Sequence, residues 1–137
     1  MKVVIDTNVF ISGVYFSGAP YLVLRAWRDE KIQVVLSLEI MAEYRRVGEI
    51  LTQDHPGIDL TKMLDFLFQN AVIYDAPLLP EQVSEDPDDE KFLACALASG
   101  SKLIVSGDKH LLKVSGYQEI EVLKPREFLD KYILANP

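Results

Sequence analysis

The sequence predicts an α/β fold, a three-layer α/β/α sandwich with a central, mainly parallel sheet. Short apolar runs that fit buried strands alternate along the chain with stretches of helical periodicity. One of these runs, 102–106, has the uninterrupted apolar character of a strand inside a parallel sheet. It follows a strongly apolar helix with capping residues at both ends. Together these observations favour a sheet covered by helices on both faces.

Two strands and a helix are predicted before residue 37. The apolar run 2–5 predicts a central strand, and the Asp-Thr-Asn that follows ends it, with a loop expected over 12–18. Pro20 suits the start of a helix with one apolar face. Residues 32–36 form a second apolar run and predict the next strand.

Two further helices are predicted on either side of a chain break. Ser37 can cap the first, in which apolar residues recur at helical spacing and Glu43 lies at the edge of their stripe. His55-Pro56-Gly57 breaks the chain, and Asp59 can cap the second helix, which has a leucine-rich face. Residues 72–74 predict a brief strand, so the alternation continues.

The stretch that begins at Asp86 carries the clearest local signals. Asp86 and Pro87 fit the N-cap and the first position of a helix, and Gly100 fits its C-terminal stop. The body of this helix is apolar on every side, which predicts an interior helix. The apolar run 102–106 predicts the strand described above, and Asp108 follows where that strand ends.

The last elements complete the sheet. Residues 119–123 alternate polar and apolar side chains, which is typical of an edge strand, and Pro125 starts a last helix. The connector 76–80 is not a domain boundary, because neither side is long enough to fold alone. With no internal repeat or low-complexity segment, we expect residues 1–137 to form a single domain.

Composition limits the class of protein. Hydrophobic residues make up 49% of the chain, which is enough for a core and excludes wholesale disorder. No apolar run approaches the roughly 20 residues that cross a bilayer, and the acid at position 6 comes too early for a signal peptide. The lone Cys95 excludes a disulfide framework and a cysteine-type zinc site, and it fits the core. We therefore expect a cytoplasmic protein with no membrane partner.

The net charge of −7 bears on possible partners. It is unfavourable for a protein that grips nucleic acid through a broad basic surface. It is compatible with a cluster of acids that binds cations, or with a basic protein partner. The two histidines, His55 and His110, fit loop positions better than metal ligands. Charge alone does not decide between these alternatives.

Four carboxylates are predicted to converge at one edge of the sheet. Sites in parallel α/β sheets form at the carboxyl ends of the strands, and Asp6 and Asp108 each follow such a strand. Asp89 lies in the first turn of the helix leading to the second of these strands, and Glu43 faces the core from an earlier helix. Crowded carboxylates repel each other, and a divalent cation relieves that repulsion. An all-oxygen set favours Mg²⁺ or Mn²⁺ and suits phosphodiester hydrolysis.

Each of these residues also fits a structural role. Asp6 and Asn8 fit a turn that ends a strand, and Ser106 and Asp108 fit an ordinary Ser-Gly-Asp turn. Glu43 becomes an exposed helix residue if the helical register moves by one position. These alternatives stay open from the residues alone.

Asp89 has the strongest structural alternative. With Asp86 as N-cap, Asp89 occupies the third helical position, where an acid forms a capping-box-like pair and favours the helix dipole. Asp88 and Glu90 weaken the assignment further, because acids are common in any first helical turn. The residues alone therefore do not select one acid from this run.

Five motifs stand in order, nearly from end to end of the chain. They are Val4-Ile-Asp-Thr-Asn-Val-Phe-Ile-Ser12, Ser37-Leu-Glu-Ile-Met-Ala-Glu-Tyr44, Asp86-Pro-Asp-Asp-Glu-Lys-Phe-Leu-Ala-Cys-Ala96, Ile104-Val-Ser-Gly-Asp-Lys-His-Leu-Leu112 and Lys124-Pro-Arg-Glu-Phe-Leu129. In this order and over this length the chain resembles a PIN domain. It is most similar to the single-domain bacterial and archaeal toxins of toxin–antitoxin pairs.

The resemblance implies a Mg²⁺- or Mn²⁺-dependent endoribonuclease that hydrolyses phosphodiester bonds in single-stranded RNA. It also implies which residues would be catalytic and hold the metal: Asp6, Glu43, Asp89 and Asp108. Asn8 would support the first of these carboxylates, and Ser106 would be the small hydroxyl residue of the turn before the last one. The fold implied is a PIN-like sandwich over residues 1–137.

The resemblance selects one acid from the run at the helix start and shows two departures. It implies Asp89, and not Asp86 or Asp88, by its distance from the apolar residues that follow. His110 stands where related chains often carry another Asp, and Ser106 replaces a more usual Thr while keeping the hydroxyl. Neither departure affects the four implied carboxylates.

The resemblance also implies partners: single-stranded RNA, a second copy of the chain in a homodimer, and a small antitoxin that inhibits the enzyme. An alternative is a PIN-fold module that binds RNA or protein and has lost catalysis, although such modules are expected to lack one or more acids. A third hypothesis is phosphotransfer through an aspartyl nucleophile at Asp6. That class needs a second Asp two residues later, where this chain has Asn8.

Overall fold

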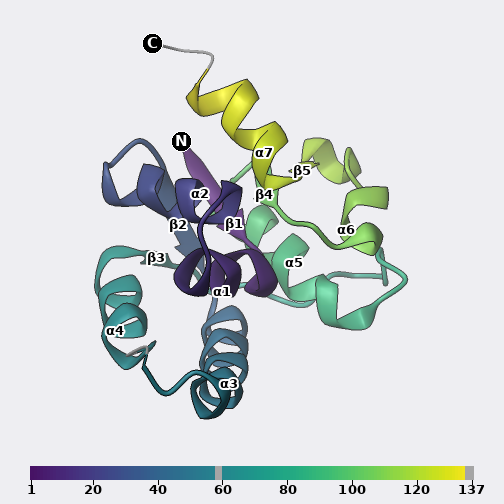
Figure 1. The fold of residues 1–137 in the computed structure, drawn as a ribbon. Helices are drawn as coiled ribbons and strands as arrows, with labels where there is room; N and C mark the ends of the chain where they lie inside the picture. Colours follow the sequence, from purple (N-terminus) through teal and green to yellow (C-terminus); the bar gives the residue numbers. More distant parts are fainter. Residues whose placement is uncertain (58–59, 135–137) are drawn as a thin grey trace.

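A parallel sheet of five strands lies at the centre of the chain, in a computed structural model that describes residues 1–57 and 60–134 (Figure 1). The strands are β1 (Lys2–Ile5), β2 (Gln33–Leu36), β3 (Val72–Ile73), β4 (Leu103–Val105) and β5 (Glu121–Leu123). Their order in the sheet is β3-β2-β1-β4-β5, and every neighbouring pair is parallel. This arrangement confirms the predicted α/β sandwich and the central place of the first strand.

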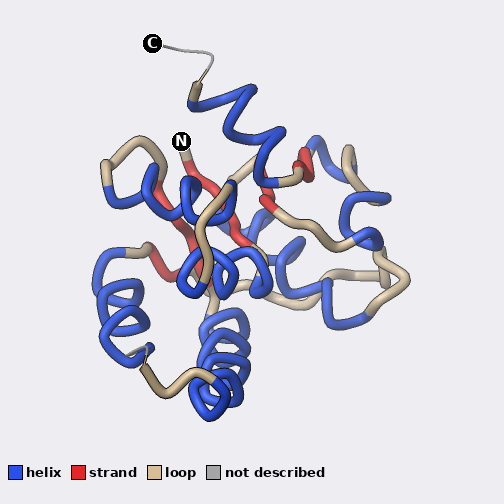
Figure 2. The backbone as a smooth tube through the Cα atoms, in the orientation of Figure 1, coloured by secondary structure: helices blue, strands red, loops and turns tan. Residues whose placement is uncertain are grey.

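Helices enclose the sheet, as Figure 2 shows. The α-helices are α1 (Thr7–Tyr15), α2 (Ala19–Arg28), α3 (Leu38–Asp54), α4 (Leu60–Asn70), α5 (Glu90–Ser99), α6 (Lys109–Lys113) and α7 (Pro125–Phe128). Shorter helical turns are η1 (Pro87–Asp89), η2 (Tyr117–Glu119) and the π-helical η3 (Leu129–Ile133). The strand order moves from β1 outward to β3 and then back across to β4 and β5. Because such crossovers are right-handed, the helices before and after this reversal cover opposite faces.

Several local predictions are confirmed. Ser37 caps α3, where its Oγ accepts a hydrogen bond from the Ile40 N–H at 3.3 Å. Gly100 ends α5 in the left-handed conformation, with φ of 75°, which a residue without Cβ adopts most readily. Pro125 begins α7. The predicted cap at Asp59 lies outside the described residues.

The segment after β1 is a helix, not the turn and loop predicted from the sequence. The loop prediction over 12–18 is wrong as far as Tyr15, the last residue of α1. Asp6 starts the helix by accepting a hydrogen bond from the Val9 N–H at 2.8 Å. Gly13 then lets α1 pack closely on α2, because a Cβ at that position would lie 2.6 Å from Leu24 Cδ1. Tertiary packing therefore stabilises a helix that its own sequence signals weakly.

The core is centred on β1, β4 and α5. Fully buried side chains of β1 and β4 meet the buried apolar residues of α5, including Leu93 and Cys95. Burying each large apolar side chain contributes about 1.5–3 kcal/mol. The prediction of a wholly interior helix is wrong at its end, since Leu97 is 37% exposed and Ala98 is also exposed. That end lies next to the surface turn at Gly100.

The carboxyl ends of β1 and β4 lie side by side. Ile5 is paired with Val105 in the parallel register, and the Asp6 N–H donates to the Val105 carbonyl at 3.0 Å. Tyr44 of α3 donates its hydroxyl to the Ile5 carbonyl and stacks on Phe10, with ring centroids 4.5 Å apart. These contacts anchor α3 against the strand end, so residues from α3 share one edge of the sheet with those that follow β1 and β4.

Among the residues that the structure describes, no single helix is long and apolar enough to cross a membrane. By length and composition alone, α1 and α2 pass such a test as a pair that is bent by 91°. Both helices contribute buried side chains to the core, including Phe10 and Val23.

Candidate metal centre

An acidic pocket lies where β1 and β4 end. It is lined by residues from the β1–α1 junction, α3, η1, α5 and the turn after β4: Asp6, Thr7, Asn8, Glu43, Val47, Asp86, Asp88, Asp89, Phe92 and Asp108. The four carboxylates selected from the sequence therefore line one hollow, and Asn8 lines it with them. Ser106 is fully buried beneath this surface and does not line it.

Asp6 is held from two directions. One carboxylate oxygen accepts the capping bond from the Val9 N–H, and the other accepts a hydrogen bond from the Ser106 hydroxyl. The residue is 4% exposed, and this burial raises the pKa of its carboxyl group. The bonds from Ser106 and Val9 partly oppose that rise, whereas the charges of Asp108 and Glu43 add to it. Asp6 thus combines a fixed orientation with an environment that disfavours its negative charge.

Asp108 caps α6, a short helix that sequence analysis does not predict. Its Oδ1 accepts hydrogen bonds from the N–H groups of His110 and Leu111, at 2.7 and 3.3 Å. Its own N–H donates to Ser106 Oγ at 2.9 Å, so the Ser106 hydroxyl links Asp6 to the turn that carries Asp108. His110 does not line the pocket; its Nδ1 lies 3.2 Å from a carboxylate oxygen of Glu85.

Asp89 does not form the capping-box-like pair that the sequence permits. The Asp86 N–H donates to Ser84 Oγ instead, at 3.3 Å, and Ser84 Oγ donates to Asp89 at 3.2 Å. Asp89 is 5% exposed, and burial raises the pKa of its carboxyl group to about 6. The charge of Asp108 contributes to this rise, and the bond from Ser84 partly opposes it. Capping therefore does not account for a buried, electrostatically strained acid.

Three aspartates among the described residues lie close enough together to hold one metal ion. Asp86, Asp89 and Asp108 each offer a carboxylate oxygen within 4.8 Å of the others. We call this group the aspartate triad. Asp86 is the member that sequence reasoning set aside, although its position three residues before Asp89 is a spacing that can bring two side chains to one side of a helical turn. Hard oxygen donors at this spacing, with a raised pKa in the group, fit a divalent cation such as Mg²⁺ or Mn²⁺.

Glu43 lies on the α3 side of the pocket and already has cationic partners. Its Oε1 is 2.7 Å from Lys91 Nζ and 3.5 Å from a guanidinium nitrogen of Arg46. Its Oε2 accepts a hydrogen bond from the Thr7 hydroxyl. Thr7 and Lys91 both stand inside motifs of the sequence, but no motif shows that they contact Glu43, because these contacts depend on how α1, α3 and α5 pack.

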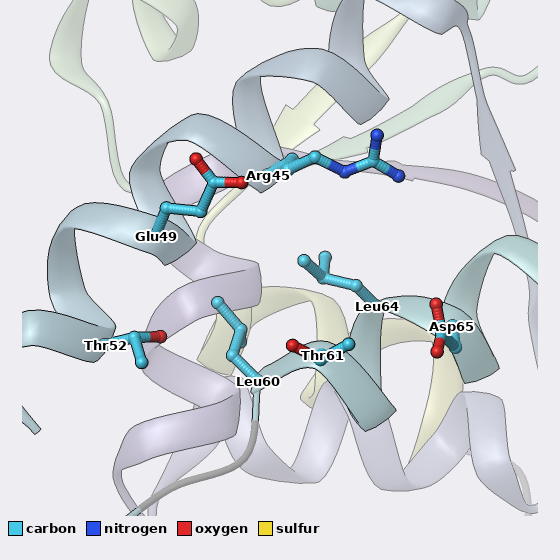
Figure 3. A pocket seen from close by; sticks show the side chains of 7 residues that line it. All are labelled: Arg45, Glu49, Thr52, Leu60, Thr61, Leu64 and Asp65. Carbon is cyan, nitrogen blue, oxygen red and sulfur yellow. The ribbon is translucent and has the colours of Figure 1, made fainter. Parts of the chain in front are cut away.

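A second hollow, between α3 and α4, has a different character (Figure 3). It is lined by Arg45, Glu49, Thr52, Leu60, Thr61, Leu64 and Asp65. The two leucines project from α4 into the space between the helices, and Gly48 permits the close approach, since a Cβ there would lie 2.0 Å from Leu60 Cδ2. This hollow is a seam of helix packing away from the strand ends.

Two comparisons with known proteins bear on the pocket. Residues 2–110 match the family model described as PIN domain, and this range contains every residue that lines the pocket. A protein of Methanocaldococcus jannaschii named uncharacterized protein MJ1680 is 28% identical over 143 aligned positions. The alignment covers 96% of this chain and 92% of that protein.

Proposed function

We propose a nuclease function from one premise: the chain belongs to the PIN-domain family, whose model matches residues 2–110. This membership implies a nuclease-type hydrolase of a family that generally depends on divalent metal ions. We propose more specifically a Mg²⁺- or Mn²⁺-dependent endoribonuclease that hydrolyses phosphodiester bonds in single-stranded RNA. The observation that carries the proposal is the convergence of six acids on one pocket at the strand ends: Asp6, Glu43, Asp86, Asp88, Asp89 and Asp108.

The donor set of the pocket fits a divalent ion. The aspartate triad supplies three oxygens within 4.8 Å of one another, and Asp6 lines the same hollow. Glu43, which completes the set expected from the family resemblance, faces the pocket from α3. When bound, such an ion orients a phosphate group, screens its charge and lowers the pKa of a coordinated water. These carboxylates come from the β1–α1 junction, α3, η1 and the turn after β4, so the fold sets the spacing between these four places.

Neighbouring hydroxyl groups hold the carboxylates in place. Ser106 donates to Asp6, Ser84 donates to Asp89, and Thr7 donates to Glu43. Such outer partners fix the orientation of a metal-binding group and limit its movement when a cation is absent. In the proposed enzyme these three hydroxyl groups keep the acids directed to one place.

We also propose a biological role, and this part rests only on the resemblance to single-domain PIN toxins. The chain would act in the cytoplasm as the toxin of a toxin–antitoxin pair, as a homodimer that a small antitoxin protein inhibits. The electrostatics of the pocket support one feature of such a partner. In a chain of net charge −7, a pocket lined by acids favours a basic inhibitory segment.

The test is cleavage of a mixed pool of single-stranded RNA by the purified protein, with Mg²⁺, with Mn²⁺ and with a chelator. We expect cuts that require the metal, disappear in Asp6→Asn and persist in Asp130→Asn, which changes an exposed acid outside the pocket. Cleavage that survives Asp6→Asn would place the activity elsewhere. Absence of cleavage with both metals would favour a PIN-fold module that binds RNA or protein without cutting it.

A further inference from the structure

Lys91 brings a cation to the wall of the acidic pocket. It extends from the first turn of α5, lines the neighbouring hollow beside Glu90 and Ala94, and reaches Glu43 on α3. The distance between Lys91 Nζ and Glu43 Oε1 is 2.7 Å, and the two side chains are 19% and 12% exposed. The pair is therefore shielded from solvent on both sides, where an ion pair is screened much less than at the surface.

The other contacts of Glu43 strengthen this arrangement. The Thr7 hydroxyl donates to Oε2, and Arg46 approaches Oε1 at 3.5 Å from an exposed position. Both carboxylate oxygens thus have a donor in the free protein. Any divalent ion that bound Glu43 directly would compete with the Lys91 ammonium group for the same oxygen.

The aspartate triad lacks this compensation. Within the described residues, Lys91 and Arg46 both pair with Glu43, and neither forms an ion pair with an aspartate of the triad. The groups that donate to Asp86 and Asp108 are backbone N–H groups, and the group that donates to Asp89 is a serine hydroxyl. Negative charge without a protein cation is therefore left on the triad and on Asp6, whose donors are the Val9 N–H and the Ser106 hydroxyl.

We propose that Lys91 is a positioning residue that separates Glu43, which it neutralises, from the aspartates of the pocket that bind the metal ion. Its ammonium group neutralises Glu43, so a divalent cation is held by the aspartates, and Glu43 reaches that cation only by displacing Lys91. This inference rests on the proposed metal-dependent function. It goes beyond that function because it states that the negative charge of Glu43 is neutralised by Lys91 and not by the metal ion. Lys91 is then a determinant of metal affinity.

Removal of the Lys91 charge strengthens binding of the divalent ion in two ways. It frees a Glu43 oxygen for the incoming ion, and it removes a positive charge that repels the ion inside the pocket. An opposite charge within about 4–6 Å typically shifts the protonation equilibrium of an acid by 10- to 1000-fold. We expect a shift of similar size in the binding equilibrium of a divalent ion when the Lys91 charge is removed. We expect Lys91→Met to bind Mn²⁺ at least about tenfold more tightly than the unaltered protein.

The experiment is calorimetric titration of the purified protein with Mn²⁺. The variants are Lys91→Met, Glu43→Gln and the double variant, with Lys131→Met as a control that removes a lysine from an exposed ion pair with Glu121. We expect tighter binding in Lys91→Met, weaker binding in Glu43→Gln, and near-original affinity in the double variant, because the two charge changes cancel. Lys131→Met should stay within about twofold, as expected for an exposed and screened charge.

An unchanged or weaker Mn²⁺ affinity in Lys91→Met would overturn the inference and leave Lys91 as a structural tie between α3 and α5. If Lys91→Met folds poorly, Glu43→Gln carries the test: unchanged Mn²⁺ affinity in that variant overturns the inference, because an unpaired Lys91 must repel the ion. Failure of the proposed function gives a different result. In that case Asp89→Asn binds Mn²⁺ as the original protein does, or neither protein binds it.

Discussion

The two walls of the acidic pocket differ in how their negative charge is compensated. On the α3 wall, Glu43 is paired with the Lys91 ammonium at 2.7 Å. Where η1 and the turn after β4 line the pocket, Asp86, Asp89 and Asp108 crowd within 4.8 Å, and the pKa of Asp89 rises to about 6. The negative charge of Glu43 is neutralised by a lysine in the free protein, whereas the repulsion among the three aspartates is relieved only when a cation is added. Mutations and conditions that affect one wall should therefore differ predictably from those that affect the other.

The largest effect is expected from a change on the uncompensated wall. Asp89→Asn removes a charge from the aspartate triad, so metal-dependent RNA cleavage should fall at least about 100-fold, the upper end of what loss of an outer-shell partner costs. Single-turnover rates at saturating Mn²⁺ measure this change. Asp65→Asn, which alters an acid in the seam between α3 and α4, provides the matched control and should retain activity. Equal losses in the two variants would remove the distinction between the pocket and that seam.

The compensated wall makes a prediction about stability without metal. Lys91→Met leaves Glu43 without its closest cation in a mostly buried place. The free energy of unfolding should fall by about 2 kcal/mol, between the costs of breaking an exposed pair and a fully buried pair. Lys131→Met breaks an exposed pair and should cost less than about 1 kcal/mol. Urea denaturation with a chelator present measures both values. Similar decreases in the free energy of unfolding in the two variants would mean that burial of the Lys91–Glu43 pair does not increase its contribution to stability.

The raised pKa of Asp89 predicts a smaller effect of pH. Because the folded protein holds this proton up to about pH 6 and the unfolded chain releases it near 3.8, the folded state binds more protons between these values. The contribution of Asp89 to stability is thus fully present below pH 3.8, and it is lost as pH rises through 6. Urea midpoints from pH 4 to 7, with a chelator, should show this decrease. Asp89→Asn should flatten the curve in that range, and an unaltered curve would contradict the assignment.

The strands and their polar ends could be predicted from the sequence because burial leaves a strong pattern there. Apolar runs identify β1 and β4, and the first acids after them, Asp6 and Asp108, fall at neighbouring strand ends once the sheet is parallel. The helix α1 could not be predicted in the same way. It is short and depends on close packing against α2 at Gly13. The residues around its cap at Asp6 also fit a turn, so they do not identify the start of a helix.

The interior of the site depends on contacts that no local pattern encodes. Asp89 is directed away from the capping geometry by the bonds that Ser84 makes, and it joins Asp86 in the triad. The pairing of Lys91 with Glu43 spans 48 positions in the sequence and arises where α3 meets α5. Family resemblance points to the acids, but the compensation of their charge becomes visible only in the packed structure.

The most direct test of the central claim is the position of a bound ion in a crystal of the protein soaked with Mn²⁺, located by anomalous scattering. We predict a peak within about 2.0–2.3 Å of aspartate oxygens of the triad, with the Lys91–Glu43 pair intact. A peak held by Glu43 and not by the aspartates of the triad, or no peak in the pocket at saturating Mn²⁺, would contradict this prediction.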